Sequence, residues 1–119
     1  MLLVGALVAI PIIILIVEAE RYHRSGPPAI ERRSREIAIQ PLLRSNATRA
    51  QVVDALGLKF VDYSVGSGNE WVIKQRISDP NILSRAQRYP GILFHTTDIM
   101  TWLFFDSEGR LRDYYLCEQ

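Results

Sequence analysis

This sequence of 119 residues has few cysteines and histidines and no charged side chain near its start. The single cysteine, Cys117, excludes an intrachain disulfide. Its position far from the apolar start also excludes a lipoprotein anchor, which needs a cysteine directly after the apolar run. A metal site needs several converging ligands, and one cysteine with the distant His23 and His95 does not supply them. We therefore expect no metal and no other cofactor.

Basic residues are missing from the start of the chain, since no Lys or Arg precedes Arg21. A cleaved signal peptide needs such residues before its apolar core. The first 17 residues, MLLVGALVAIPIIILIV, carry no charged side chain, and about 17–25 apolar residues span a bilayer. The sequence therefore predicts an uncleaved, single-pass transmembrane helix over residues 1–19, which places the chain in the lipid bilayer. A buried core helix is the alternative.

The charge that is present is unevenly placed. Residues 18–49 hold seven Arg against four Glu, and residues 50–119 hold seven Lys and Arg against nine acids. Basic residues beside an apolar span are attracted to anionic headgroups, and a nucleic-acid surface would need a denser basic face. The predicted membrane-surface residues are Arg21, Arg24, Arg32, Arg33 and Arg35. The positive-inside rule applied to these arginines places the following domain in the cytoplasm.

Two segments follow the predicted anchor. Residues 20–45 are expected to form a basic juxtamembrane stalk and a solvated helix over residues 29–40, with a narrow apolar stripe of Ile30, Ile37 and Ala38. Pro41 should end this helix. Residues 46–119 are expected to form one small domain.

The domain begins with a clear helix signal. Thr48 and Gln51 have the spacing of a capping box, and Gly57 suits the left-handed residue after a helix. The sequence therefore predicts a helix over Arg49–Leu56. Asp79 followed by Pro80 similarly predicts the start of a helix over residues 81–88.

The remaining segments have strand patterns. Residues 58–65 and 70–77 are rich in β-formers and predict a hairpin around a turn at 66–69. Residues 92–105 are a long apolar stretch broken near 97–98, within which Met100, Trp102 and Phe104 share one face. A tight turn at 106–109 joins that stretch to a closing strand over residues 110–117. The order predicts an α+β fold, with short helices packed on one face of a three- or four-stranded antiparallel sheet.

Two segments carry a family resemblance. Residues 46–57, NATRAQVVDALG, and residues 103–111, LFFDSEGRL, resemble the opening helix and terminal hairpin of the BamE/SmpA/OmlA small envelope protein domain. Asn46 stands where that family usually has glycine, and residues 78–91 are a longer insertion. The resemblance covers about residues 40–119. It implies two helices against an antiparallel sheet, a protein-binding role in the bacterial envelope, and a periplasmic position for the domain. Combined with the predicted uncleaved anchor, this gives a single-pass protein of the bacterial inner membrane whose domain is periplasmic.

Catalytic motifs are weak. His95, close to Thr96, Thr97 and Asp98, is the one candidate for hydrolase chemistry, but neighbouring strand residues point to opposite faces and no oxyanion loop accompanies them. We therefore expect no enzyme and no small-molecule substrate.

Aromatic residues supply the candidate binding surface. Successive aromatics on a strand cannot share a face, so some should point outward, where they mark binding surfaces. The candidate partner-binding residues are Trp71, Trp102, Phe105 and Tyr114. We expect a membrane-anchored module that binds another envelope protein. The alternatives are an immunity protein or enzyme inhibitor and, third, a hydrolase that uses His95.

Overall fold

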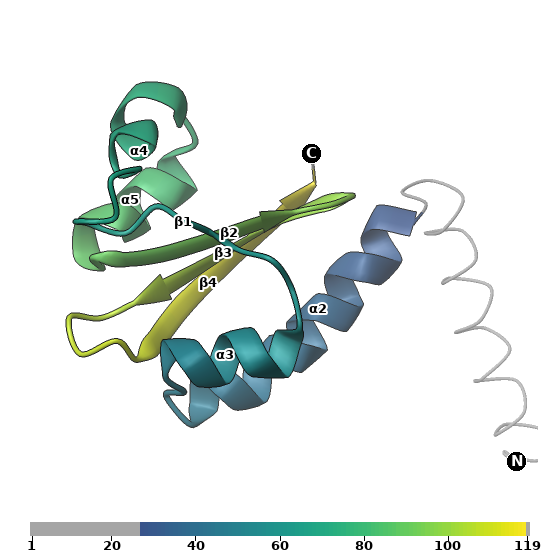
Figure 1. The fold of residues 1–119 in the computed structure, drawn as a ribbon. Helices are drawn as coiled ribbons and strands as arrows, with labels where there is room; N and C mark the ends of the chain where they lie inside the picture. Colours follow the sequence, from purple (N-terminus) through teal and green to yellow (C-terminus); the bar gives the residue numbers. More distant parts are fainter. Residues whose placement is uncertain (1–26, 119) are drawn as a thin grey trace, which may run out of the picture.

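A computed structural model describes residues 27–118, so the predicted transmembrane anchor over residues 1–19 lies outside the described residues. No helix within residues 27–118 is long and apolar enough to cross a membrane. The described residues form four helices and four strands (Figure 1): α2 Pro27–Arg44, α3 Arg49–Leu56, β1 Val61–Asp62, α4 Trp71–Arg76, α5 Pro80–Arg88, β2 Gly91–Thr96, β3 Ile99–Phe105 and β4 Leu111–Glu118.

The four strands form one antiparallel sheet in the order β1-β2-β3-β4. The break predicted near residues 97–98 is the turn between β2 and β3, and the closing hairpin is confirmed, with Thr101 opposite Leu116. Gly109 takes a φ of 78° in the turn between β3 and β4, a conformation that glycine adopts without steric penalty. The predicted α+β class and antiparallel sheet are therefore confirmed.

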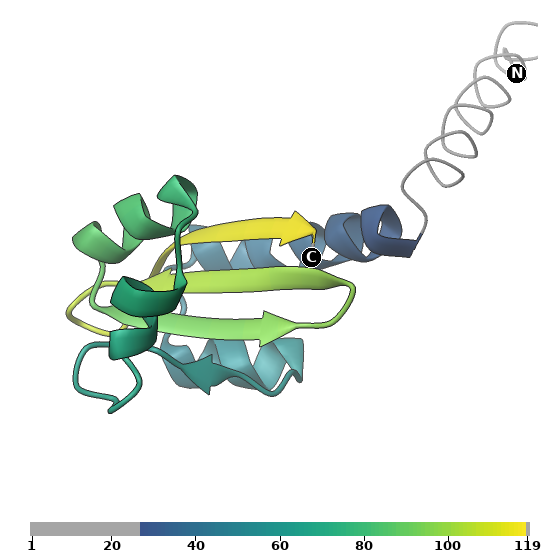
Figure 2. The same cartoon turned by 90° about the horizontal axis from the view of Figure 1, so that it is seen from above.

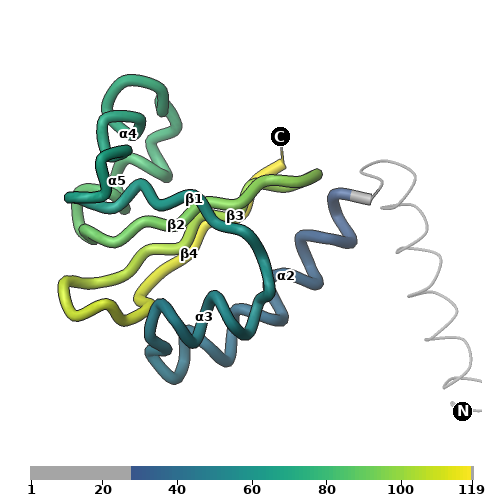
Figure 3. Tube along the Cα trace, in the orientation of Figure 1, coloured from purple at the N-terminus to yellow at the C-terminus, as the bar shows by residue number. Residues whose placement is uncertain are grey.

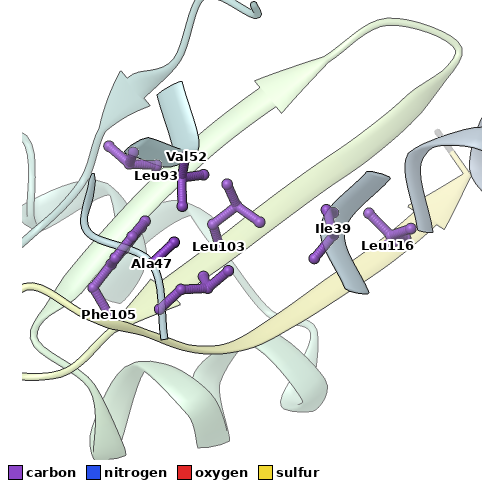
Figure 4. Packing of buried hydrophobic residues seen from close by; sticks show 8 residues of the cluster. Ile39, Ala47, Val52, Leu93, Leu103, Phe105 and Leu116 are labelled. Carbon is purple, nitrogen blue, oxygen red and sulfur yellow. The ribbon is translucent and has the colours of Figure 1, made fainter. Parts of the chain in front are cut away.

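One face of the sheet is covered by α2 and α3 (Figures 1 and 4). Along β3, alternate side chains point to opposite faces, and Leu103 and Phe105 point to this one. The buried residues of this first core cluster are Ile39, Ala47, Val52, Leu93, Leu103, Phe105, Leu111 and Leu116.

The other face is covered at one end by α4 and α5, as Figures 1 and 2 show. Ile73 and Ile82 from these helices are buried there with residues of the sheet. The buried residues of this second core cluster are Ile73, Ile82, Ile92, Trp102 and Phe104. The prediction that all helices lie on one face is therefore wrong. Both faces of β3 are apolar, so both need a cover to remove that surface from water. Figure 3 traces the chain from α3 through β1 to α4, from one face to the other.

Helix α2 differs from its prediction in where it ends and in which of its residues are buried. It continues through Pro41 to Arg44, although an internal proline costs about 3 kcal/mol or more. Ile39 is fully buried, whereas Ile30 and Ile37 of the predicted stripe are 55% and 65% exposed. Burial of Ile39, with Leu42 and Leu43 packed around the same cluster, stabilises the helix beyond the proline. Residues 27–44 therefore pack with the rest of the domain and are not a solvated lead-in.

Helix α3 has the predicted caps. The Thr48 hydroxyl accepts a hydrogen bond from the Gln51 N–H, and the Gln51 side chain accepts one from the Thr48 N–H. Gly57 ends the helix at φ 63° in the left-handed region. Asn46, just before the helix, also has a positive φ of 50°. Asparagine is one of the few other residues that tolerate it.

The hairpin predicted over residues 58–77 is wrong. Only Val61–Asp62 is a strand in that stretch, and Trp71–Arg76 is the short helix α4. Glu70 closes the preceding loop, because its carboxylate accepts hydrogen bonds from the N–H groups of Gly66 and Gly68, both at 2.9 Å. The helical turn then buries Ile73 in the second core cluster. The helix predicted after Asp79 is confirmed as α5, and Asp79 accepts from the Asn81 N–H.

Candidate functional site

Strand β4 forms one edge of the sheet, while the opposite edge, β1, has only two residues. The N–H of Tyr63 donates to the carbonyl of Ile92, which therefore faces β1. In an antiparallel sheet, successive residues of a strand direct their backbone N–H and C=O groups toward alternate neighbouring strands. Followed from Ile92 through the pairs of β2 with β3 and of β3 with β4, this rule places the backbone groups of Tyr114, Leu116 and Glu118 on the outer side of β4. No strand within residues 27–118 lies beyond this edge.

The beginning of the β4 edge is closed by other groups. The N–H of Leu111 donates to the carbonyl of Ala47 at 2.8 Å, and the Asn46 side chain donates to the carbonyl of Leu111 at 3.3 Å. The N–H of Tyr114 donates to the carboxylate of its neighbour Asp113 at 2.8 Å. The open part of the edge therefore runs from the carbonyl of Tyr114 to Glu118.

A polar cleft of about 330 Å³ lies along this edge, between α2 on one side and α5 on the other. It gathers two arginines, two carboxylates and two tyrosines from three elements that are distant in sequence. The lining residues are Arg32, Glu36, Arg85, Asp113, Tyr114, Tyr115 and Leu116.

Helix α2 holds one wall of the cleft. The hydroxyl of Tyr114 accepts a hydrogen bond from Gln40 at 2.8 Å and donates to Glu36 at 3.3 Å. Burial and the nearby negative charge of Glu36 raise the pKa of Tyr114 above its ordinary value. The tyrosine therefore stays neutral and ties the edge strand to the helix.

Helix α5 holds the other wall. The carboxylate of Asp113 pairs with the Arg85 guanidinium at 3.0 Å, and that guanidinium also lies 5.3 Å from the centroid of the Tyr115 ring. The hydroxyl of Tyr115 lies 3.2 Å from Asp79 and 3.4 Å from Asn81. Desolvation and hydrogen bonding to Asp79 raise the pKa of Tyr115. Both walls are thus fixed by contacts to β4 itself.

The chemistry of this cleft suits recognition of a polypeptide. The open edge presents backbone donors and acceptors in the spacing of a strand, and the walls present charges of both signs. Each tyrosine hydroxyl has a carboxylate partner and a raised pKa, so neither is activated as a nucleophile. Within residues 27–118, no three His, Cys, Asp or Glu side chains lie close enough together to hold a metal ion.

The predicted partner-binding aromatics separate into three environments. Tyr114 lines the cleft. Trp71 is 46% exposed on α4, with the Arg76 guanidinium 5.6 Å from its ring centroid. Trp102 and Phe105 are 1% and 0% exposed, so their outward orientation is wrong. They lie on opposite faces of β3, and both faces are covered by helices.

The predicted membrane-surface arginines also separate. Arg32 and Arg33 are exposed on α2, and Arg32 lines the cleft. The side chain of Arg35 is only 11% exposed, because it pairs with Glu31 at 2.9 Å and donates to the hydroxyl of Thr101 on β3. A membrane-surface position for Arg35 is therefore wrong. Arg21 and Arg24 lie outside the described residues.

His95 and Cys117 have structural surroundings. One ring nitrogen of His95, Nδ1, lies 2.8 Å from the carbonyl of Lys59 and so donates to it. Its ring packs edge-on against Phe60. Nearby Thr97 donates instead to Glu31 on α2. Burial and the charge of Asp79 raise the pKa of the Cys117 thiol, which lowers its reactivity.

Comparison with known proteins gives no relative: the chain matches no protein-family model, no curated protein and no solved structure. The resemblance to the BamE-type domain therefore rests on the capping and turn residues of this sequence.

Most of the residues that line the cleft are not predicted from the sequence. Of the residues that line the cleft, only Arg32 and Tyr114 are among the residues that the sequence predicts for a site, and the sequence predicts a membrane-surface role for Arg32. Arg85 and Asp113 carry no local signal, because they are 28 residues apart and meet only when α5 packs beside β4. The adjacent Tyr114 and Tyr115 were the available clue, since one of them had to face each side of the strand.

Proposed function

We propose that this chain is a non-catalytic protein-binding module of the bacterial envelope, anchored in the inner membrane by residues 1–19. Its binding site is the open edge of β4. An extended segment of another envelope protein adds to the sheet there as a further strand, hydrogen-bonded through the outward groups of Leu116 and Glu118. This function is argued from the chemistry of the β4 edge and not from the fold alone.

The single observation that supports this proposal is the open edge of β4 between two helical walls. Proteins usually blunt long edges with charge, bulges or covers to avoid unwanted pairing. Here the carbonyl of Ala47 and the side chains of Asn46 and Asp113 close only the beginning of the strand. Strand addition gives affinity through the backbone and specificity through alternate side chains. Arg32 and Glu36 on one wall, with Arg85 and Asp113 on the other, select a segment of mixed charge.

We propose that the domain lies on the periplasmic side, as the family resemblance implies. The arginines after residue 20 favour the cytoplasm instead. The direction of insertion is therefore a separate test, and strand addition is chemically the same on either side.

Site-specific photocrosslinking tests the proposed site. A photoreactive amino acid replaces Arg32 in the cleft of the full-length chain in living cells, and a matched chain carries it at Asp54, which is exposed on α3. We expect a discrete adduct to one envelope protein from position 32 and none from position 54. Equal adducts from both positions, or none from either, would contradict the proposal. An adduct to a toxin or another enzyme would identify the module as an immunity protein or inhibitor.

A further inference from the structure

The outer face of α2 exposes apolar side chains that the domain does not cover. Ile30 and Ile37 are 55% and 65% exposed. They are seven residues apart, so they lie two turns apart on the same side of the helix. Ile39, which faces the sheet, is fully buried. Pro41, also exposed, continues the outer stripe one turn further.

The charges around this outer face have one sign. Arg33 and Arg44 flank the stripe at helical spacing and are exposed. The two acids of α2 are directed elsewhere: Glu31 pairs with Arg35 and accepts a hydrogen bond from Thr97, and Glu36 accepts one from Tyr114. The face is therefore apolar at its centre and basic at its margin.

We infer that this face of α2 lies on an anionic lipid surface. Such surfaces accept the apolar side chains of a helix lying in the interface plane and attract nearby basic residues at about 1 kcal/mol each. Only nine residues of sequence, 18–26, separate the uncharged run over residues 1–17 from the start of α2. This inference rests on the anchor in the proposed function, since the anchor holds α2 close to the bilayer.

The placement fixes how the domain stands on the membrane. Because α2 and the pair α4 and α5 cover opposite faces of the sheet (Figure 2), α4 and α5 point away from the lipid. Arg32 and Glu36, on a different side of α2, keep facing the cleft. The β4 edge is then presented beside the membrane surface, where a segment of another membrane protein can reach it.

Spin-label accessibility in bilayers tests this inference. The full-length chain with Cys117→Ser carries single cysteines in separate variants, Ile30→Cys, Ile37→Cys and, as control, Val65→Cys, which is 72% exposed far from α2 in sequence. Each is labelled and reconstituted in vesicles of equal phosphatidylcholine and phosphatidylglycerol, and in phosphatidylcholine alone. Collisions with oxygen and with a water-soluble nickel chelate are measured for each label.

In the anionic vesicles, the ratio of oxygen to nickel collisions should be higher at positions 30 and 37 than at position 65. The difference should shrink in phosphatidylcholine. Labels at positions 30 and 37 that collide with the nickel chelate as often as the label at position 65 would overturn the inference. Labels at 30 and 37 that are shielded from both oxygen and nickel in both kinds of vesicle would also overturn it, because that result indicates that protein covers the face. Flotation of the chain with the vesicles separates the two proposals: a floating chain with water-exposed labels contradicts only the inference, and a chain that does not float contradicts the anchor as well.

Discussion

At the scale of single residues, a few side chains connect elements that are distant in sequence. Arg49 on α3 pairs with Asp62 on β1 at 2.8 Å and donates to the Ser64 hydroxyl at 2.9 Å. The same hydroxyl accepts from the N–H of Ile92 on β2. These contacts tie the short β1 segment to both α3 and the sheet. Two residue-scale changes test such contacts.

Asp62→Asn should make the stability of the fold less sensitive to a fall in pH. Burial opposes ionisation of Asp62, but hydrogen bonds from Ser64 and the charge of Arg49 outweigh it, so the pKa lies below its ordinary value of 3.8. A carboxyl group whose pKa is lowered by folding stabilises the folded state at pH values above its pKa in the unfolded chain. This stabilisation is lost as the pH falls through the pKa of the group in the folded state. Thermal unfolding midpoints measured from about pH 5 to pH 2 should therefore fall less in Asp62→Asn than in the parent. An identical slope in the two proteins would show that Asp62 is not held in this way.

Gly91→Ala should destabilise the protein. A Cβ at position 91 would lie 2.7 Å from the Phe105 Cβ and 3.2 Å from the Phe105 carbonyl oxygen. Overpacking of this kind costs about 1–3 kcal/mol. Where there is room, replacing glycine by alanine instead stabilises by about 0.4–1 kcal/mol. The sign of the change in unfolding free energy, measured with denaturant, therefore decides whether β2 and β3 approach this closely.

At the scale of elements, the register of α2 on the sheet decides which of its residues are buried. Ile39→Ala should cost about 2–5 kcal/mol of unfolding free energy, because it opens a cavity in the first core cluster. The matched change Ile37→Ala removes the same atoms from an exposed position and should stay within about 0.5 kcal/mol. Denaturant unfolding of the full-length variants in detergent measures both. Similar losses, or the reverse order, would place α2 in a different register.

Elements with a local chemical signal could be predicted from the sequence. The capping box of Thr48 and Gln51, the cap at Asp79 and the turn ending at Gly109 each depend on neighbouring residues, so their outcome agrees with prediction. Helix α4 could not be recognised, because six residues from Trp71 to Arg76 fit either period. There, burial of Ile73 in the second core cluster favours the helix.

The site was harder to predict than the fold. The cleft exists only after α2 and α5 pack on opposite sides of β4, and no spacing in the sequence brings Glu36 near Tyr114, 78 residues away. The sequence pattern instead favours the large aromatic residues as site candidates. Trp102 and Phe105 are buried because both faces of the sheet are covered. The cover of the second face includes α4, which no local signal predicts.

At the scale of the whole molecule, the proposed function combines three parts: a predicted anchor, a helix that faces lipid and an open strand edge. The proposed orientation has a direct test. Alkaline phosphatase fused after Gln119 should be active, and green fluorescent protein at the same place should be dark, if the domain lies in the periplasm. The reverse pair of results would move the module and its partner to the cytoplasmic surface of the membrane.

If a partner strand adds to β4, the outward backbone N–H groups of this strand must donate hydrogen bonds to it. One matched pair of variants tests this. The outward backbone N–H of Glu118 is removed in Glu118→Pro and kept in Glu118→Ala, and both lose the same charge. Proline is tolerated on edge strands, so the fold should persist. Photocrosslinking from position 32 should be abolished by Glu118→Pro and retained by Glu118→Ala. Equal crosslinking in the two variants would contradict strand addition at this edge.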